Sequence, residues 1–146
     1  MAAEQQNVRV QAQIKNQVDG RLNLYRNQNW SGQVVGSYPI NLNPLETRDF
    51  VHNGIGPNGS KAAIVYERFT NNAAWLVAWT FTNNIYKVYA ECGPRQNYAN
   101  PNWNEIEEKL RTRGGQSTEF DDFETGTEVI ASINDRGALS ITFKLA

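Results

Sequence analysis

Residues 61–92 read KAAIVYERFTNNAAWLVAWTFTNNIYKVYAEC, and this stretch decides the fold class. Two Thr-Asn-Asn turns divide it into three extended segments, which predicts a three-stranded β-meander. The middle segment, residues 75–81, is apolar on both faces, with Trp75, Val77, Trp79 and Phe81 on one and Leu76 and Ala78 on the other. A strand of this kind is typical of the centre of a sheet that is covered on both sides. The chain is therefore predicted to build a layered β core.

Alternation of apolar and polar residues marks further strands at the two ends of the chain. Residues 8–14 and 139–145 each place apolar side chains on one face only, so each is predicted to cover the core and leave the other face wet. The turn at residues 18–20 is predicted to close a hairpin with a strand that begins at Leu22. Two prolines interrupt residues 34–44, which favours an edge or a corner of the sheet there.

Residues 102–113 change the period of the pattern from two to about 3.6. Trp103, Ile106 and Leu110 fall on one stripe, and Asn102 is suited to cap the N-terminus of a helix. Together these patterns predict a mainly β protein, an antiparallel β-sandwich with one short α-helix at about residues 102–113 packed across one edge. The sandwich is predicted to be a single domain that spans residues 1–146.

Composition restricts the partners and the compartment. The formal net charge is −1, which gives no electrostatic reason to expect nucleic acid as a partner. The N-terminal residues MAAEQQNVRV lack the basic region and apolar run of a secretion signal, so we expect a cytoplasmic or nucleocytoplasmic protein with no signal peptide. Cys92 is the only cysteine, which excludes an internal disulfide and suits a small buried side chain in a reducing compartment.

Signals for catalysis are weak. His52 is the only histidine, and the chain contains none of the HExxH, CxxC, P-loop or GxSxG patterns. The acidic stretch TEFDDFET at residues 118–125 is compatible with an acid–base pair or a calcium loop, although a solvated loop explains it as well. We therefore predict a protein that is not an enzyme, with no catalytic residue, no metal and no cofactor.

Loop aromatics and carboxamides favour a binding surface for a neutral polar ligand. A sugar presents apolar C–H faces and many hydroxyl groups, so a site that recognises it needs a flat ring to stack on and uncharged donors and acceptors around it. The candidate ligand-binding residues are Asn27, Asn29, Trp30, Ser31, Tyr38, Asn97 and Tyr98, with Asn100 and Asn102 nearby. Trp30, Tyr38 and Tyr98 are the expected stacking platforms. The alternative role for Trp30 is to plug one end of the sandwich.

The stretch GSKAAIVYERFTNNAAWLVAWTFTNNIYKVYAE resembles a segment of the plant 23 kDa jasmonate-induced protein-like family, around its Ala-Ala-Val-Val-Tyr and Trp-Met-Leu-Ala-Trp motifs. The residues NWSGQVVGSYPINLNP resemble the Trp-Gly and Tyr-Pro segment of the same family, and Phe50-Val51-His52 matches its Phe-x-His strand. The similarity spans about residues 24–133. It implies a plant stress or defence setting.

The order of elements is also similar, more distantly, to the actinoporin-like sandwich of sea-anemone pore formers, moss relatives and fungal fruit-body lectins. Those pore formers rely on an amphipathic helix ahead of the first strand, whereas only MAAEQQN precedes Val8, so perforation by that route is not expected. We predict a carbohydrate-binding, lectin-like defence or stress protein that binds a sugar or glycoconjugate. The alternative is an actinoporin-like, cytolysin-related protein that binds membrane lipid headgroups. A homodimer would suit a lectin because it raises avidity.

Overall fold

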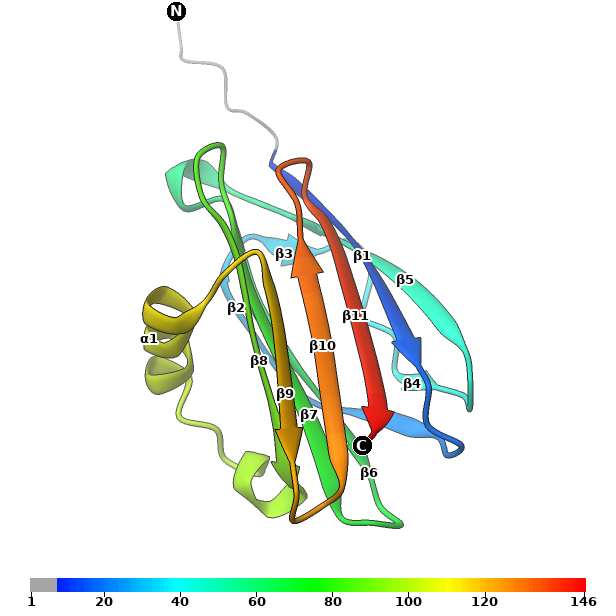
Figure 1. Cartoon of the computed structure of the whole chain (residues 1–146). Helices are drawn as coiled ribbons and strands as arrows, with labels where there is room; N and C mark the ends of the chain where they lie inside the picture. The colour runs from blue at the N-terminus through cyan, green and yellow to red at the C-terminus, as the bar shows by residue number, and fades with distance from the viewer. Residues whose placement is uncertain (1–7) are drawn as a thin grey trace, which may run out of the picture.

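The computed structural model describes residues 8–146 and arranges them as two facing β-sheets with one α-helix outside them (Figure 1). The six-stranded sheet has the order β3 (Gln33–Val34), β5 (Thr47–Asn53), β1 (Arg9–Asn16), β11 (Ala138–Leu145), β10 (Thr127–Ile133) and β9 (Ser117–Asp122). The five-stranded sheet has the order β4 (Asn41–Leu42), β2 (Leu22–Ser31), β6 (Ser60–Arg68), β7 (Ala73–Phe81) and β8 (Tyr86–Pro94). The predicted mainly β sandwich is confirmed.

Strands β6, β7 and β8 form the predicted meander, with β7 paired on both sides. Trp75, Val77 and Trp79 of β7 face the other sheet and belong to the main core between the two layers. Leu76 and Ala78 point the other way, into a second apolar cluster beneath the helix. Both faces of β7 are therefore buried, as its sequence predicts, because each face has its own covering layer.

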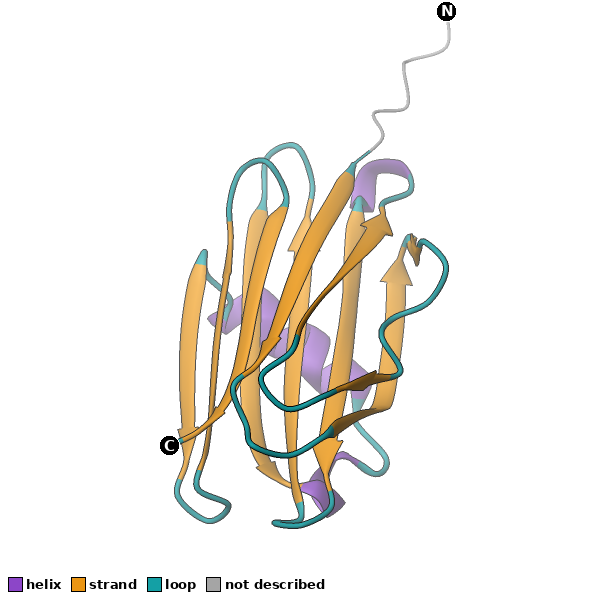
Figure 2. Cartoon of the chain, turned by 90° about the vertical axis from the view of Figure 1, so that its right-hand side faces the viewer, coloured by secondary structure: helices purple, strands orange, loops and turns teal. Residues whose placement is uncertain are grey.

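The helix α1 (Trp103–Arg113) covers the outer face of the five-stranded sheet (Figures 1 and 2). Its boundaries follow from local chemistry. Asn102 Oδ1 accepts a hydrogen bond from the backbone N–H of Glu105 at 3.1 Å, which satisfies one free donor of the first turn. Ile106 and Leu110 are the buried residues of its stripe. The predicted helix and its cap are confirmed, and no helix within residues 8–146 is long and apolar enough to cross a bilayer.

One predicted pairing is wrong, because β1 and β2 do not form a hairpin. They belong to different sheets, and β1 pairs instead with β5 and, in parallel, with β11. The buried side chain of Asn16 explains the crossing, since its Nδ2 donates to the carbonyls of Gly20 and Asn43 and its Oδ1 accepts from the N–H of Val18. These bonds stabilise a connection between layers rather than a tight turn within one layer.

The short strands β3 and β4 lie at sheet edges, as the prolines around them predict. Two short 3-10 helices complete the chain, η1 (Gly56–Asn58) after β5 and η2 (Arg95–Tyr98) after β8. The acidic stretch forms the edge strand β9 and the turn that follows it. In Figure 1 the β10–β11 turn and η1 lie at the upper end of the sandwich, and the β6–β7 and β9–β10 turns lie at the lower end.

Candidate ligand-binding surfaces

Two of the three expected stacking platforms are not on the surface. Only 4% of Tyr38 and 6% of Tyr98 is exposed. The Tyr38 ring meets Phe50 edge-on inside the main core, and the Tyr98 ring packs into the apolar cluster beneath α1. The prediction that these two rings stack on a ligand is wrong. Tyr38, between β3 and β4, and Tyr98, in η2, each lie beside an apolar cluster that buries the ring.

Tyr38 and Asn29 belong to a hydrogen-bond network that joins the two sheets. Tyr38 and His52 are buried in it, whereas Asn29 is an exposed residue that contributes its Oδ1. Asn29 Oδ1 accepts a hydrogen bond from the Tyr38 hydroxyl at 2.6 Å, so His52 Nε2, 3.0 Å from the same oxygen, acts as a donor. His52 Nδ1 then accepts from the Ser60 hydroxyl at 2.7 Å, and Ser60 Oγ accepts from Trp79 Nε1–H at 3.0 Å. His52 is on β5 of one sheet, and its two hydrogen-bond partners come from β2 and β6 of the other, where Trp79 of β7 donates to Ser60.

Burial lowers the pKa of His52 to about 4. The imidazole is therefore neutral near pH 7. Both of its ring nitrogens form hydrogen bonds, one with Ser60 and one with Asn29. Burial likewise raises the pKa of the Cys92 thiol to about 11, so this sulfur stays protonated. The single histidine and the single cysteine serve the interior of the sandwich, and they belong to different sheets.

The other sequence-predicted residues lie apart from one another. The half-buried Trp30 meets Trp103 of α1 edge-on, with ring centroids 6.1 Å apart, and so faces the helix side of β2. Asn29, one residue away, faces the opposite side. Ser31 Oγ donates to the carbonyl of Gly59 at 2.8 Å, whereas Asn27 is exposed on β2 and Asn97 is exposed on η2. These residues do not converge on one pocket, and Trp30 is the one predicted platform that keeps part of its ring at the surface.

A groove lies on the outer face of the six-stranded sheet. The sequence does not predict it, because none of the candidate ligand-binding residues lines it. It has a volume of about 720 Å³ and runs across β5, β1, β11 and β10. We call it the sheet-face groove. Its outward side chains are Gln11, Gln13, Asp49, Val51, Ser132, Asn134, Ala138 and Ser140.

Strand register places the polar groups of the sheet-face groove in a row. Asp49 is paired with Gln13, Gln13 with Ser140, and Ser140 with Ser132. Since neighbouring strands are about 4.8 Å apart, this row of four residues spans about 14 Å. It offers amide, hydroxyl and carboxylate groups on exposed side chains, with a single formal charge at Asp49. The backbone beneath is held in the sheet, so the spacing of the row is fixed.

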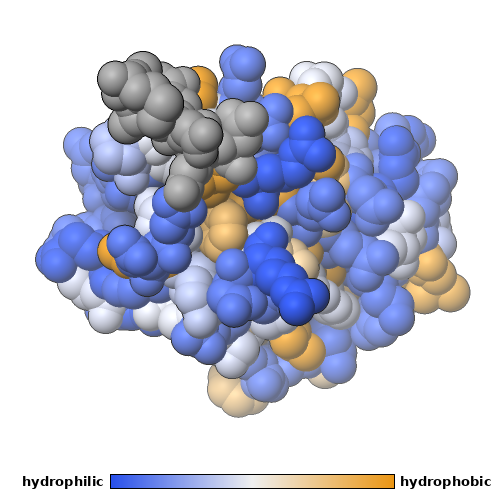
Figure 3. Space-filling model, turned by 90° about the horizontal axis from the view of Figure 1, so that it is seen from above, coloured by the Kyte–Doolittle hydropathy of each residue, from blue (hydrophilic) through white to orange (hydrophobic). Residues whose placement is uncertain are grey.

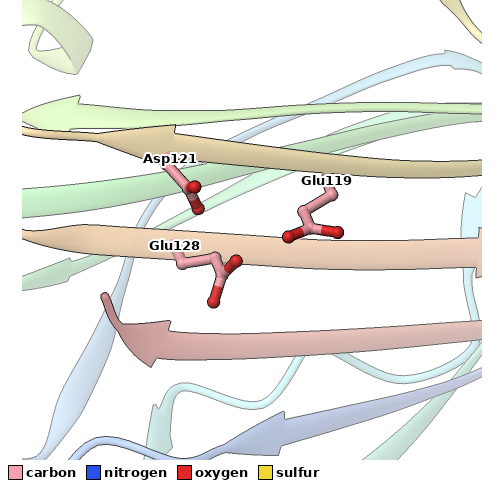
Figure 4. Close-up of side chains that lie close together, drawn as sticks. All are labelled: Glu119, Asp121 and Glu128. Atoms are coloured by element: carbon pink, nitrogen blue, oxygen red, sulfur yellow. The ribbon is translucent and has the colours of Figure 1, made fainter.

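Three carboxylates meet farther down the same face (Figure 4). Glu119 and Asp121 of β9 and Glu128 of β10 place oxygen atoms within 4.8 Å of one another. Hydrogen bonds to Glu128 raise the pKa values of Glu119 and Asp121, and Lys144 Nζ lies 3.2 Å from Glu128. Carboxylate oxygens suit a hard divalent cation. Glu119 and Asp121 are exposed on the edge strand and the lysine partly balances the charge, so this stretch keeps the solvated character that its sequence predicts.

Comparisons with known proteins complete the description of the chain. No protein-family model matches it. It is 32% identical over 148 residues to a protein of Atriplex canescens described as a jasmonate-induced protein homolog, and the match covers 91% of this chain and 80% of that protein. Among solved structures it is similar to the crystal structure of the lipid binding protein Nakanori, with a TM-score of 0.80. That match has 16% sequence identity and covers 93% of this chain and 69% of the other, so the likeness concerns the fold.

Proposed function

Because the chain belongs to the jasmonate-induced protein family of plants, we propose that it is a non-enzymatic stress or defence protein that binds a carbohydrate in the sheet-face groove. The observation that carries this proposal is the row of polar side chains across four adjacent strands, three of them neutral and the fourth the Asp49 carboxylate. Few classes of ligand present a matching series of hydroxyl groups at short, regular spacing. A saccharide does.

The chemistry of the row suits hydroxyl groups. A carboxamide such as that of Gln13 can donate and accept at once, and the Ser132 and Ser140 hydroxyls can do the same. The Asp49 carboxylate accepts stronger hydrogen bonds than a neutral group, which would orient one end of the ligand. Val51 and Ala138 add small apolar contacts for C–H faces. The groove is open to solvent along the sheet, so its hydrogen bonds compete with water and the affinity of a single site is expected to be modest.

The non-enzymatic part of the proposal is supported by the state of the residues that most often do acid–base or nucleophilic chemistry. His52 is neutral, buried and hydrogen-bonded at both nitrogens. Cys92 is a buried thiol whose Sγ lies 3.7 Å from the carbonyl oxygen of Phe120, to which it donates. General bases and nucleophiles need access to substrate, which both of these side chains lack.

A glycan array followed by calorimetry tests the proposal. The wild-type protein is expected to give a signal with at least one glycan class. Gln13→Ala and Ser140→Ala should each weaken binding several-fold, up to about tenfold, which is the usual contribution of one neutral hydrogen bond. Gln33→Ala is the matched control, since Gln33 is an exposed glutamine at the edge of the same sheet and outside the groove. It should leave the signal unchanged.

Two outcomes would overturn the assignment. A silent array for the folded wild-type protein would remove carbohydrate as the ligand. The second outcome is an array signal that is unchanged in Gln13→Ala and Ser140→Ala but lost in Trp30→Ala. This result would place the binding site at the pair formed by Trp30 of β2 and Trp103 of α1. Thermal unfolding of each variant, compared with the wild type, separates a lost ligand contact from a lost fold.

A further inference from the structure

A small pocket lies at the open edge of the sandwich, between β5 and the segment that connects β3 to β4. It has a volume of about 280 Å³ and is lined by residues 37–41 together with Arg48 and Asp49. Strand β3 pairs only with the end of β5 at His52 and Asn53. Among the strands that the structure describes, none pairs with this edge of β5 at residues 47–50. We call this site the Arg48 pocket.

Arg48 brings a positive charge to the pocket. Its side chain lies on the same face of β5 as the core residue Phe50, but at the exposed end of the strand. No carboxylate within residues 8–146 forms an ion pair with its guanidinium. Burial raises the pKa of the Tyr66 hydroxyl, and the charge of Arg48 acts to lower it. That hydroxyl donates to the carbonyl of Pro39 at 2.6 Å, so the charge of Arg48 is felt at the wall of the pocket.

The edge of β5 adds a backbone donor. The N–H of Asn16 donates to the carbonyl of Glu46 at 2.9 Å, so the even-numbered residues of this strand direct their backbone groups toward β1. The odd-numbered residues direct theirs away from β1, and the carbonyl of Val51 accepts from the N–H of Val35 at 2.8 Å. The N–H of Asp49 is therefore directed to the side of β5 on which the pocket lies. The carboxylate of Asp49 lies instead in the sheet-face groove.

The segment between β3 and β4 supplies the remaining lining groups. The Ser37 hydroxyl and the Asn41 carboxamide are neutral donors, and neither side chain is hydrogen-bonded to another residue of the described part of the chain. Ile40 is 71% exposed, and Pro39 is buried beside it. The pocket thus combines one cation, several neutral donors and a small apolar surface.

We propose that the Arg48 pocket binds a small monocarboxylic acid, with the carboxylate on the Arg48 guanidinium and the Asp49 N–H. A guanidinium presents two parallel N–H donors that match the two oxygens of a carboxylate. One unpaired cation balances a single negative charge and leaves a phosphate dianion partly uncompensated.

The size of the pocket sets the size of the ligand. Sites for drug-sized molecules measure roughly 300–1,000 Å³, so a volume of about 280 Å³ suits a small acid with a short apolar body, which Ile40 and Pro39 can contact. This site lies on the other side of β5 from the groove side chains. It does not depend on carbohydrate binding.

An NMR titration of the isotope-labelled full chain with benzoate tests this proposal, with benzamide as the uncharged analogue of the same shape. Benzoate should shift the Asp49 amide and the Arg48 Nε–H signals to saturation, and benzamide should bind about tenfold more weakly or less. Arg48→Gln should weaken benzoate binding by about tenfold or more, the usual contribution of a hydrogen bond to a charged group. Arg48→Lys keeps the charge but loses the paired donors, so its affinity should be intermediate.

Arg136→Gln is the matched control. Arg136 is exposed in the β10–β11 turn, at the upper end of the sandwich, where the surface is mainly hydrophilic (Figure 3). This variant should bind benzoate like the wild type.

Four results would overturn the proposal. They are the absence of a saturable shift at Asp49, equal affinity for benzamide and benzoate, wild-type affinity in folded Arg48→Gln, and tighter binding of inorganic phosphate than of benzoate. The amide spectrum of each variant shows whether it is folded. Because benzoate carries no sugar hydroxyl groups, the outcome is independent of the glycan array.

Discussion

At the scale of single residues, the interior of the sandwich uses polar side chains to fix how the layers meet. A hydrogen-bond network runs from Tyr38 through the exposed Asn29 to His52, Ser60 and Trp79, and it satisfies the buried polar groups of His52, Ser60 and Trp79. A buried polar group without a partner is costly, so this network favours one relative placement of β2, β5 and β6. Tyr38, which the sequence suggests as a ligand contact, is buried in this network and stabilises the fold, whereas Asn29 takes part through its Oδ1 and remains an exposed residue.

The state of His52 leads to a prediction about acid stability. Its pKa is about 4 in the folded protein and about 6.5 in an unfolded chain. Between these values the unfolded state binds more protons, so the free energy of unfolding falls as the pH drops from about 6.5 to about 4, by roughly 2–3 kcal/mol from this residue. Above about pH 6.5 the contribution is fully present. Urea unfolding at a series of pH values measures it.

The control is His52→Gln, which keeps a neutral side chain and removes the titration. Its loss of stability between pH 6.5 and 4 should be smaller than that of the wild type, while the contribution of carboxylates is common to both. Because the chain has one histidine, its ring C–H signal in NMR reports this residue alone. A midpoint near 6.5 in the folded protein would contradict the assignment.

At the scale of elements, the sequence predicts most where one local pattern persists over a whole segment. The meander, the both-sided burial of β7, the helix and the edge position of the proline-flanked strands all follow from periodicity and turn chemistry. The connection between β1 and β2 does not follow from such patterns. Turn residues indicate that the chain reverses direction, but they do not indicate whether the next strand joins the same sheet. Asn16 decides this through contacts with Leu42 and Asn43, which are distant in sequence.

The cap of α1 provides a prediction at this scale. Asn102→Ala removes the acceptor for the Glu105 N–H and should lower the free energy of unfolding by about 1 kcal/mol. Asn104→Ala is the matched control, since Asn104 is an exposed asparagine inside the same helix, where alanine is the better helix former. It should be neutral or slightly stabilising. Equal loss of stability in the two variants would show that Asn102 is not the cap in solution.

At the scale of the whole molecule, the surface that we propose for carbohydrate binding is the sheet-face groove. The sequence resemblance to jasmonate-induced proteins is confirmed by the relative from Atriplex canescens. The cytoplasmic location, the absence of a nucleic-acid partner and the homodimer stay predictions. Light scattering at two concentrations checks the oligomeric state.

The groove could not be predicted from the sequence because it is assembled by pairings across the whole chain. Alternation shows that Gln13 and Ser140 point to the wet side of their strands, but these residues are brought together by the parallel pairing of the first and last strands. Aromatic residues outside the strands are predicted to stack on a ligand because the sequence alone does not show which of them are buried. The structure shows that Tyr38 and Tyr98 are buried.

NMR titration of the labelled protein with the glycan selected on the array tests the central claim most directly. If the sheet-face groove is the binding site, the largest amide shifts will cluster on β1, β11 and β10 around Gln13, Ser140 and Ser132, and the signals of Trp30 and Trp103 will stay in place. Shifts centred on Trp30 and Trp103, with the groove residues unchanged, would contradict the account.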